Sequence, residues 1–218
     1  MQGRPLALLL CGLVSQAALA DGDVPAGQQI ALQGNGKGAM ACVGCHGVNG
    51  EGNAAAGFPR LAGLSDHYLV KQLQGYKQGT RQNPVMQPIA TVLEEQEMRD
   101  VAAYYAGMTP AGGTTATEGG EAGKVLALRG AWDQDIPACI SCHGPGGRGV
   151  DPHFPALAGQ HAGYLKAQLQ AWRAGTRNND HNDLMGVVAE RMTEAQIDAV
   201  VAFFAGLDPV EPVAGDAP

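Results

Sequence analysis

Apolar residues recur at intervals of three and four along the chain, in two sets of three stretches. This spacing places them on one face of a helix, so each set predicts three helices. The first covers 26–33 and recurs at 122–129, each ending before a glycine that is typical of helix C-termini. The second has Leu69, Leu73 and Tyr76, or Leu165, Leu169 and Trp172, on one face, and the third has Met98, Val101, Ala102 and Tyr105, or Ile197, Val200, Val201 and Phe204.

These sets belong to an internal repeat. Residues 57–81 recur 96 positions later, and the segment from Met86 recurs 99 positions later from Met185. Because the shift changes only between the predicted helices, the chain contains two copies of one domain. No stretch alternates like a strand, so the fold class is all-α. The predicted parts are residues 21–110 and 121–209 as domains, 111–120 as a Gly- and Thr-rich linker, and 210–218 as a Pro-rich tail.

The first 20 residues have the pattern of an export signal. An apolar run at 5–14 is followed by small residues up to Ala20 and then by Asp21, which predicts cleavage after Ala20 and a periplasmic location. The apolar run is too short to cross a bilayer. A lipid anchor at Cys11 is the alternative, but the bulky Leu10 precedes it.

The net charge is −7, and removing the signal with Arg4 makes it −8. Binding of nucleic acid depends on clustered Lys and Arg, and no basic stripe occurs in the sequence. Nucleic acid is therefore not expected among the partners.

Two short motifs carry the chemistry. Each is C-x-x-C followed directly by histidine, the arrangement for covalent attachment of a c-type haem. Two disulfides or one four-cysteine zinc site are the alternatives, but neither requires the histidines, and the motifs are 97 residues apart. The sequence predicts two covalently bound haem c groups, attached at Cys42 and Cys45 and at Cys139 and Cys142, with His46 and His143 as iron ligands.

The sixth iron ligand decides whether a haem is open to substrate or closed for electron transfer. Met86 and Met185 occupy aligned positions, which we place in a polar loop before the third helix of each copy, and we predict them as ligands. The second loop is three residues longer and contains His181, a strong alternative ligand for the second iron. The helix after Met185 keeps its register, however, so the extra residues are expected to carry His181 outwards.

The two C-x-x-C-H motifs, the F-P-x-L-A-G segments and G-T-R before an aligned methionine resemble the dihaem cytochrome c4 family over nearly the whole mature chain. The resemblance implies two tandem cytochrome c domains, related by pseudo-twofold symmetry, whose terminal helices cross. It also implies a haem environment: carbonyls of Pro59 and Pro155 that accept from the histidines, Leu61 and Leu157 packed on the haems, and Arg81 and Arg177 paired with propionates. Plain turn prolines and solvated surface arginines are the alternatives.

The resemblance implies an electron carrier rather than an enzyme. Its expected partners are a quinol-oxidising complex and a terminal oxidase or reductase, with peripheral association to such membrane complexes. The alternative is a cytochrome subunit or acceptor of a sulfide-oxidising flavoprotein or a thiosulfate dehydrogenase. A dihaem peroxidase would need one accessible iron, which two methionine ligands would exclude.

Overall fold

The computed structural model describes residues 21–111 and 120–210, and no β-strand occurs in these two parts. The predicted all-α class is confirmed. The predicted signal with Cys11, most of the linker and the end of the tail lie outside the described residues. None of the described helices is long and apolar enough to span a membrane. The helices are α1 (Val24–Gln33), α2 (Val43–His46), α3 (Asp66–Gln78), α4 (Met86–Thr91), α5 (Glu95–Ala106), α6 (Gly120–Arg129), η1 (Trp132–Gln134), α7 (Ile140–His143), η2 (Pro145–Gly147), α8 (Ala162–Arg173), η3 (His181–Asp183), α9 (Leu184–Arg191) and α10 (Glu194–Ala205).

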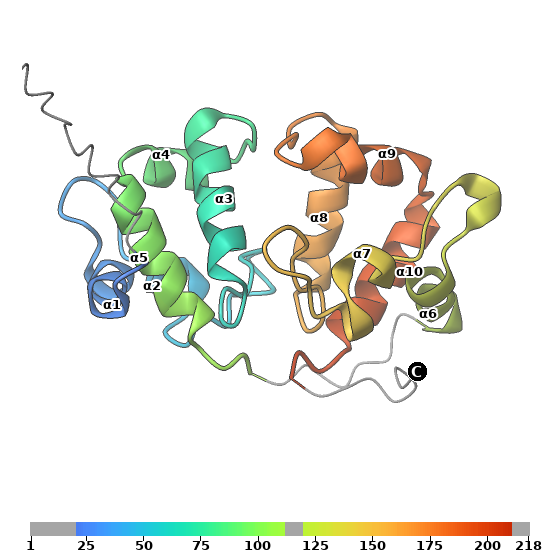
Figure 1. Ribbon diagram of the computed structural model, residues 1–218, viewed down its shortest axis with the longest axis horizontal. Coiled ribbons are helices and arrows are strands. Elements are labelled where there is room, and N and C mark those ends of the chain that lie inside the picture. Colours follow the sequence, from blue (N-terminus) through green and yellow to red (C-terminus); the bar gives the residue numbers. More distant parts are fainter. Residues whose placement is uncertain (1–20, 112–119, 211–218) are drawn as a thin grey trace, which may run out of the picture.

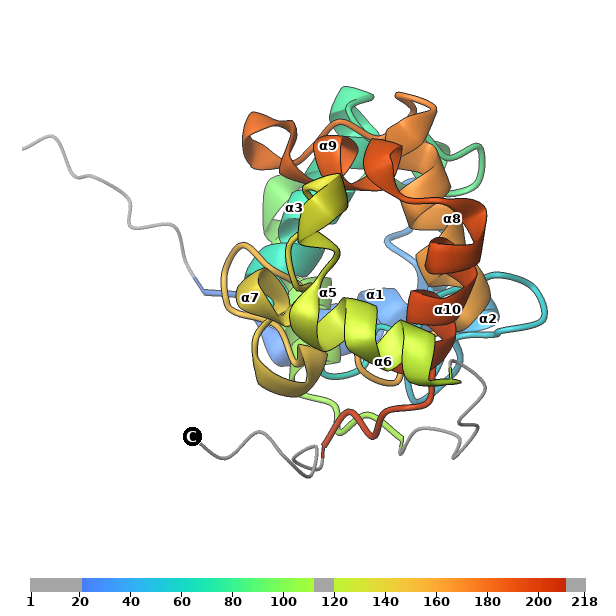
Figure 2. The same cartoon turned by 90° about the vertical axis from the view of Figure 1, so that its right-hand side faces the viewer.

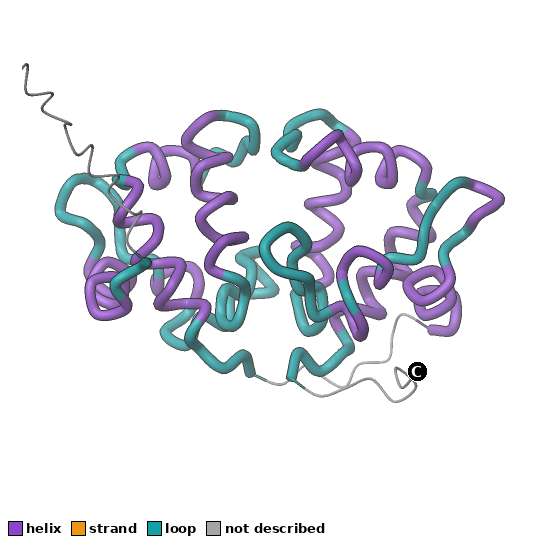
Figure 3. The backbone as a smooth tube through the Cα atoms, in the orientation of Figure 1, coloured by secondary structure: helices purple, strands orange, loops and turns teal. Residues whose placement is uncertain are grey.

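The two domains lie side by side with approximate twofold symmetry (Figure 1). α3 and α8 form the inner sides of the two halves, whereas α1 and α6 lie at the outer ends. Long loops connect these helices around the middle of the molecule (Figure 3). This arrangement places α3 and α8 each next to the other domain.

The first and last helices of each domain cross closely. α1 packs against α5, and α6 packs against α10 (Figure 2). A Cβ atom on Gly27 would lie 1.9 Å from the Asp100 carbonyl oxygen, and one on Gly123 would lie 2.2 Å from that of Ala199. Only glycine permits this approach of the two backbones. The crossing that the resemblance implied is therefore present in both copies.

Helix caps explain where several of these helices begin. α1 starts two residues earlier than expected because the Asp23 carboxylate accepts from the Ala26 amide. α10 begins with the capping box that Thr193 and Gln196 predict. In the first copy Glu94 and Glu97 form the equivalent box at α5.

Arg60 connects the two domains from a buried position. Its guanidinium donates to the carbonyls of Ala158 and Gly159 in the second domain, at 2.9 and 3.3 Å, and also to Ala62. Burial lowers the pKa of Arg60 to about 10, which reflects the cost of moving the charge out of water. The equivalent residue of the second copy is Ala156, so this contact exists on one side of the interface only.

Replacing Arg60 with methionine should weaken domain docking. A buried carbonyl without a donor costs about 1–3 kcal/mol, and release of the buried charge offsets part of that, so a net loss of about 2 kcal/mol is expected. Hydrogen exchange of amides in the interface measures it. Arg191→Met is the control, because that guanidinium donates to an exposed carbonyl of Asp135. Unchanged exchange in Arg60→Met would contradict the assignment.

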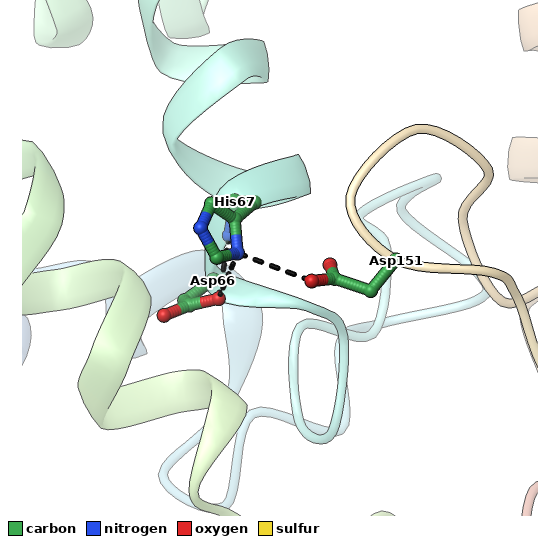
Figure 4. Close-up of side chains that lie close together, drawn as sticks. All are labelled: Asp66, His67 and Asp151. Atoms are coloured by element: carbon green, nitrogen blue, oxygen red, sulfur yellow. Dashed lines mark hydrogen bonds and ion pairs between the residues drawn. The ribbon is translucent and has the colours of Figure 1, made fainter.

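A second, exposed contact joins the domains at the start of α3. His67 Nδ1 lies 3.0 Å from the Asp66 carboxylate and 3.2 Å from that of Asp151 in the second domain (Figure 4). All three side chains are more than half exposed, so the ion pairs contribute little to stability.

Candidate functional site

The short helices α2 and α7 place the C-x-x-C-H motifs at two cavities. The first cavity has a volume of about 390 Å³ and lies in the first domain, next to the second. The four motif cysteines are free, and none belongs to the cluster of potential metal ligands found in the described part of the chain, so the disulfide and zinc alternatives are not supported. The predicted site residues that line the first cavity are Cys42, Cys45, His46, Pro59, Leu61, Arg81 and Met86, and those that line the second are Cys139, His143, Pro155, Leu157, Arg177 and Met185.

The two motif histidines are buried and oriented alike. His46 Nδ1 is 3.0 Å from the carbonyl oxygen of Pro59, and His143 Nδ1 is 2.8 Å from that of Pro155. Burial lowers the pKa of both imidazoles, which keeps the rings neutral. A carbonyl oxygen only accepts, so Nδ1 carries the proton and Nε2 keeps a free lone pair. Each ring is thereby prepared to bind a metal through Nε2.

The two methionines do not lie in loops, which corrects the sequence prediction. Met86 is the first residue of α4, and Met185 is the second residue of α9. The Met185 amide donates to the Asp180 carboxylate at 2.7 Å, and Trp172 Nε1 donates to the same carboxylate at 3.1 Å. His181 lies on the surface, with its ring 5.5 Å from that of His153. The longer loop therefore directs His181 away from the cavity that Met185 lines.

Arg81 and Arg177 lie at the domain interface, and the surface-charge alternative is wrong. Each is 4% exposed, and the two form an antiparallel bridge between the domains. Each guanidinium also stacks on an aromatic ring: Arg81 lies 4.6 Å from the centre of Tyr76, and Arg177 lies 3.9 Å from that of Trp172. Both arginines line the first cavity, and Arg177 lines the second as well.

The hydrogen bonds of the two arginines are reciprocal. Arg81 donates to Tyr164 and Gln168 of the second domain, at 2.7 and 2.6 Å. Arg177 donates to the equivalent residues of the first domain, Tyr68 at 3.3 Å and Gln72 at 2.9 Å. The four partner side chains were not predicted from the sequence. Their signal is that tyrosine and glutamine, spaced four apart, recur on the apolar face of the second helix in both copies.

The charges in this network test whether haem suits the cavities. Every described partner that accepts a hydrogen bond from the two guanidiniums is a neutral side chain. Two buried positive charges are stabilised by a nearby anion, which the propionates of a haem supply. The remaining lining is mostly apolar, as the porphyrin requires. The residues present therefore fit two haem groups, and Arg81 and Arg177 would supply positive charge for their propionates.

Comparison with known proteins also indicates a haem protein. The cytochrome c family pattern matches residues 26–108 and 122–208. A protein of Stutzerimonas stutzeri (strain A1501) named thiosulfate dehydrogenase electron acceptor is 51% identical over 211 residues, covering 93% of this chain and 94% of that protein. The structure of reduced recombinant cytochrome c4 from Pseudomonas stutzeri matches with a TM-score of 0.76 and 35% identity, over 85% of this chain and 99% of that one. The structure of thiosulfate dehydrogenase (TsdBA) from Marichromatium purpuratum matches with a TM-score of 0.79 and 43% identity, over 84% of this chain and 40% of that longer one.

The chain belongs to the cytochrome c family. Within it, the tandem domains place the chain with the dihaem cytochromes c4, as the sequence analysis predicted. It carries two covalently bound haem c groups at its C-x-x-C-H motifs and transfers electrons rather than catalysing a reaction.

Proposed function

We propose that this chain is the periplasmic acceptor of electrons from a thiosulfate dehydrogenase. The observation that carries the proposal is the 51% identity, over nearly the full length of both chains, to a protein named as such an acceptor. Identity to the structure of cytochrome c4 is lower, at 35%. A segment of the longer thiosulfate dehydrogenase chain also resembles both domains together. This is the alternative that the sequence analysis kept open.

The two sites suit this task. Each haem c, when bound, supplies one reversible Fe(III)/Fe(II) couple. Oxidative coupling of two thiosulfate anions to tetrathionate releases two electrons, so one chain matches one turnover. The chain's own residues hold the predicted ligands in place: Pro59 and Pro155 orient the histidines, and Asp180 fixes the backbone of Met185. Fixed ligands reduce the reorganisation that accompanies each change of iron charge.

Export follows from the same proposal. The apolar signal at residues 1–20 directs the chain to the periplasm, the compartment in which bacterial c-type haem is attached. Electrons would leave the reduced chain for a terminal oxidase or reductase. The proposal replaces the quinol-oxidising complex as donor, since no similarity described above names one.

The proposal predicts rapid reduction by the dehydrogenase. In stopped-flow mixing of the oxidised protein with thiosulfate and a catalytic amount of purified thiosulfate dehydrogenase, two electrons per chain should be taken up. Thiosulfate alone should reduce the protein at least about 100-fold more slowly, because the uncatalysed reaction lacks positioned reactants. Reduction by a quinol-oxidising complex, together with none by the dehydrogenase, would refute the proposal.

A matched variant checks the stoichiometry. Cys139→Ala with Cys142→Ala removes covalent haem attachment from the second domain only. After extraction of non-covalent haem, this variant should accept one electron per chain. An uptake of two would mean that the second motif does not hold a redox group.

A further inference from the structure

One peptide unit connects the predicted ligand His46 to the other domain. Its carbonyl, from Pro59, accepts from His46 Nδ1 at 3.0 Å. Its N–H, from Arg60, donates to Oε1 of Gln160 at 2.9 Å. Gln160 belongs to the second domain. A continuous chain of hydrogen bonds therefore runs from a side-chain amide of one domain to the imidazole of the other.

Gln160 is held in a single orientation. Its Nε2 donates to the carbonyl of Arg60 at 2.9 Å, and its Oε1 also accepts from the His161 amide at 3.0 Å. The side chain is 2% exposed. The backbone N–H groups of Arg60 and His161 both need an acceptor, so the Gln160 side-chain amide cannot rotate by 180° without losing all three hydrogen bonds. Its oxygen is thus fixed against the peptide that holds His46.

The second domain lacks this connection. His143 donates to the Pro155 carbonyl at 2.8 Å, as in the first domain. The residue equivalent to Gln160 is Leu64, which lines the second cavity together with Pro155 and Ala156. Leucine has no acceptor, and among the described residues the Ala156 amide has no hydrogen-bond partner. The two histidines are therefore held by peptide units of different polarisation.

We infer that Gln160 is a positioning residue that lowers the reduction potential of the first haem relative to the second. Accepting a hydrogen bond from a peptide N–H draws electron density towards the carbonyl oxygen of the same unit, so that oxygen becomes a stronger acceptor. A stronger acceptor at Nδ1 makes the imidazole a better electron donor through Nε2. A better donor stabilises ferric iron more than ferrous iron, which lowers the potential. The effect crosses the interface, so it depends on domain docking.

The test is Gln160→Leu, which copies the residue of the second domain. The potential of the first haem should rise, and the equilibrium of electron sharing between the haems should shift about threefold towards the first. At 59 mV per tenfold for a one-electron couple, this is about 28 mV. Spectroelectrochemical titration gives the potentials, and hyperfine-shifted ¹H resonances assign them to the two haems. The resonances of the His46 ring should move, and those of the His143 ring should not.

Two further variants separate this role from a structural one. Gln160→Glu keeps an acceptor oxygen towards the Arg60 amide and should return the first potential to the wild-type value or below it. Leu64→Gln places an amide at the equivalent position and should lower the second potential. Because Leu64 also lines the first cavity, the first potential is measured in the same titration. The inference is overturned if Gln160→Leu leaves the first potential unchanged or shifts both equally. It is also overturned if the Glu variant shifts the potential in the same direction as the Leu variant.

This inference rests on His46 binding the first iron but not on the identity of the donor. The potentials are measured on the isolated protein, so failure of the thiosulfate dehydrogenase assay would leave the result intact. Failure of the potential shift would likewise leave the partner assignment unaffected.

Discussion

Substituting alanine for Met185 is expected to halve the near-infrared charge-transfer band of the ferric protein and to open the second haem to cyanide. The side chain of Met185 is half-buried and lines the second cavity with His143. As the predicted sixth ligand, its thioether would close the iron to other ligands and raise the potential. Without it, that iron has no sulfur ligand, so its contribution to the band disappears. Absorption spectra with and without cyanide measure both effects.

Two control variants test whether the loss of the band is specific to the methionine ligands. His181→Ala should leave the band unchanged, because His181 is exposed and lies against His153 rather than in the cavity. Met86→Ala should also halve the band, since Met86 lines the first cavity. If His181→Ala instead shifts the second potential and admits cyanide, the histidine is the ligand and the loop rearranges when haem is bound.

Removing the first haem should unfold the first domain. Cys42→Ala with Cys45→Ala prevents its covalent attachment, and extraction then removes any haem that remains. If the cavity of about 390 Å³ stayed empty, ~24 cal/mol per Å³ would give a cost of up to about 9 kcal/mol. Small proteins have a total stability of about 5–15 kcal/mol, so little or none would be left. Far-UV circular dichroism should show loss of roughly half the helical signal, since each domain holds a similar share of the helices.

The second domain provides the comparison. Its cavity is about 100 Å³, which by the same relation costs about 2 kcal/mol. The corresponding double variant, Cys139→Ala with Cys142→Ala, should therefore retain more helix and melt at a higher temperature than the first. Equal loss of helix in the two variants would show that cavity volume does not set the dependence on haem. Native helix content in both would show that neither domain needs its haem to fold.

The helices that the sequence predicted are those with a long apolar face. α1, α3 and α5 and their repeats span ten or more residues, enough for three or four apolar positions to recur. α2, α4 and α7 span only four to six residues, and α9 spans eight. Such short helices contain too few turns for a pattern to be recognised, and their conformation depends on packing around the cavities. This explains why both methionines were placed in loops.

Site residues could be predicted from the sequence where the residue type has few functions in proteins. The cysteine–histidine motifs and the methionines at aligned positions identified residues that line both cavities, although Cys142 is not among those that line the second. Arginine and glutamine have many roles, and their function here depends on the other domain. Arg81 and Gln160 act through contacts with residues 83 to 100 positions away, which no local pattern encodes. The axial roles of the histidines and methionines remain predictions.

The reciprocal bonds across the interface suggest how this chain arose. Arg81 donates to Gln168 while Arg177 donates to Gln72, so each half offers the other the same surface. This is the form of an isologous contact in a symmetric homodimer, in which one gene supplies both sides. After duplication and fusion of that gene, the two sides of the interface can change independently of each other. Arg60 and Gln160, whose counterparts are Ala156 and Leu64, are a divergence that a homodimer of identical chains cannot acquire.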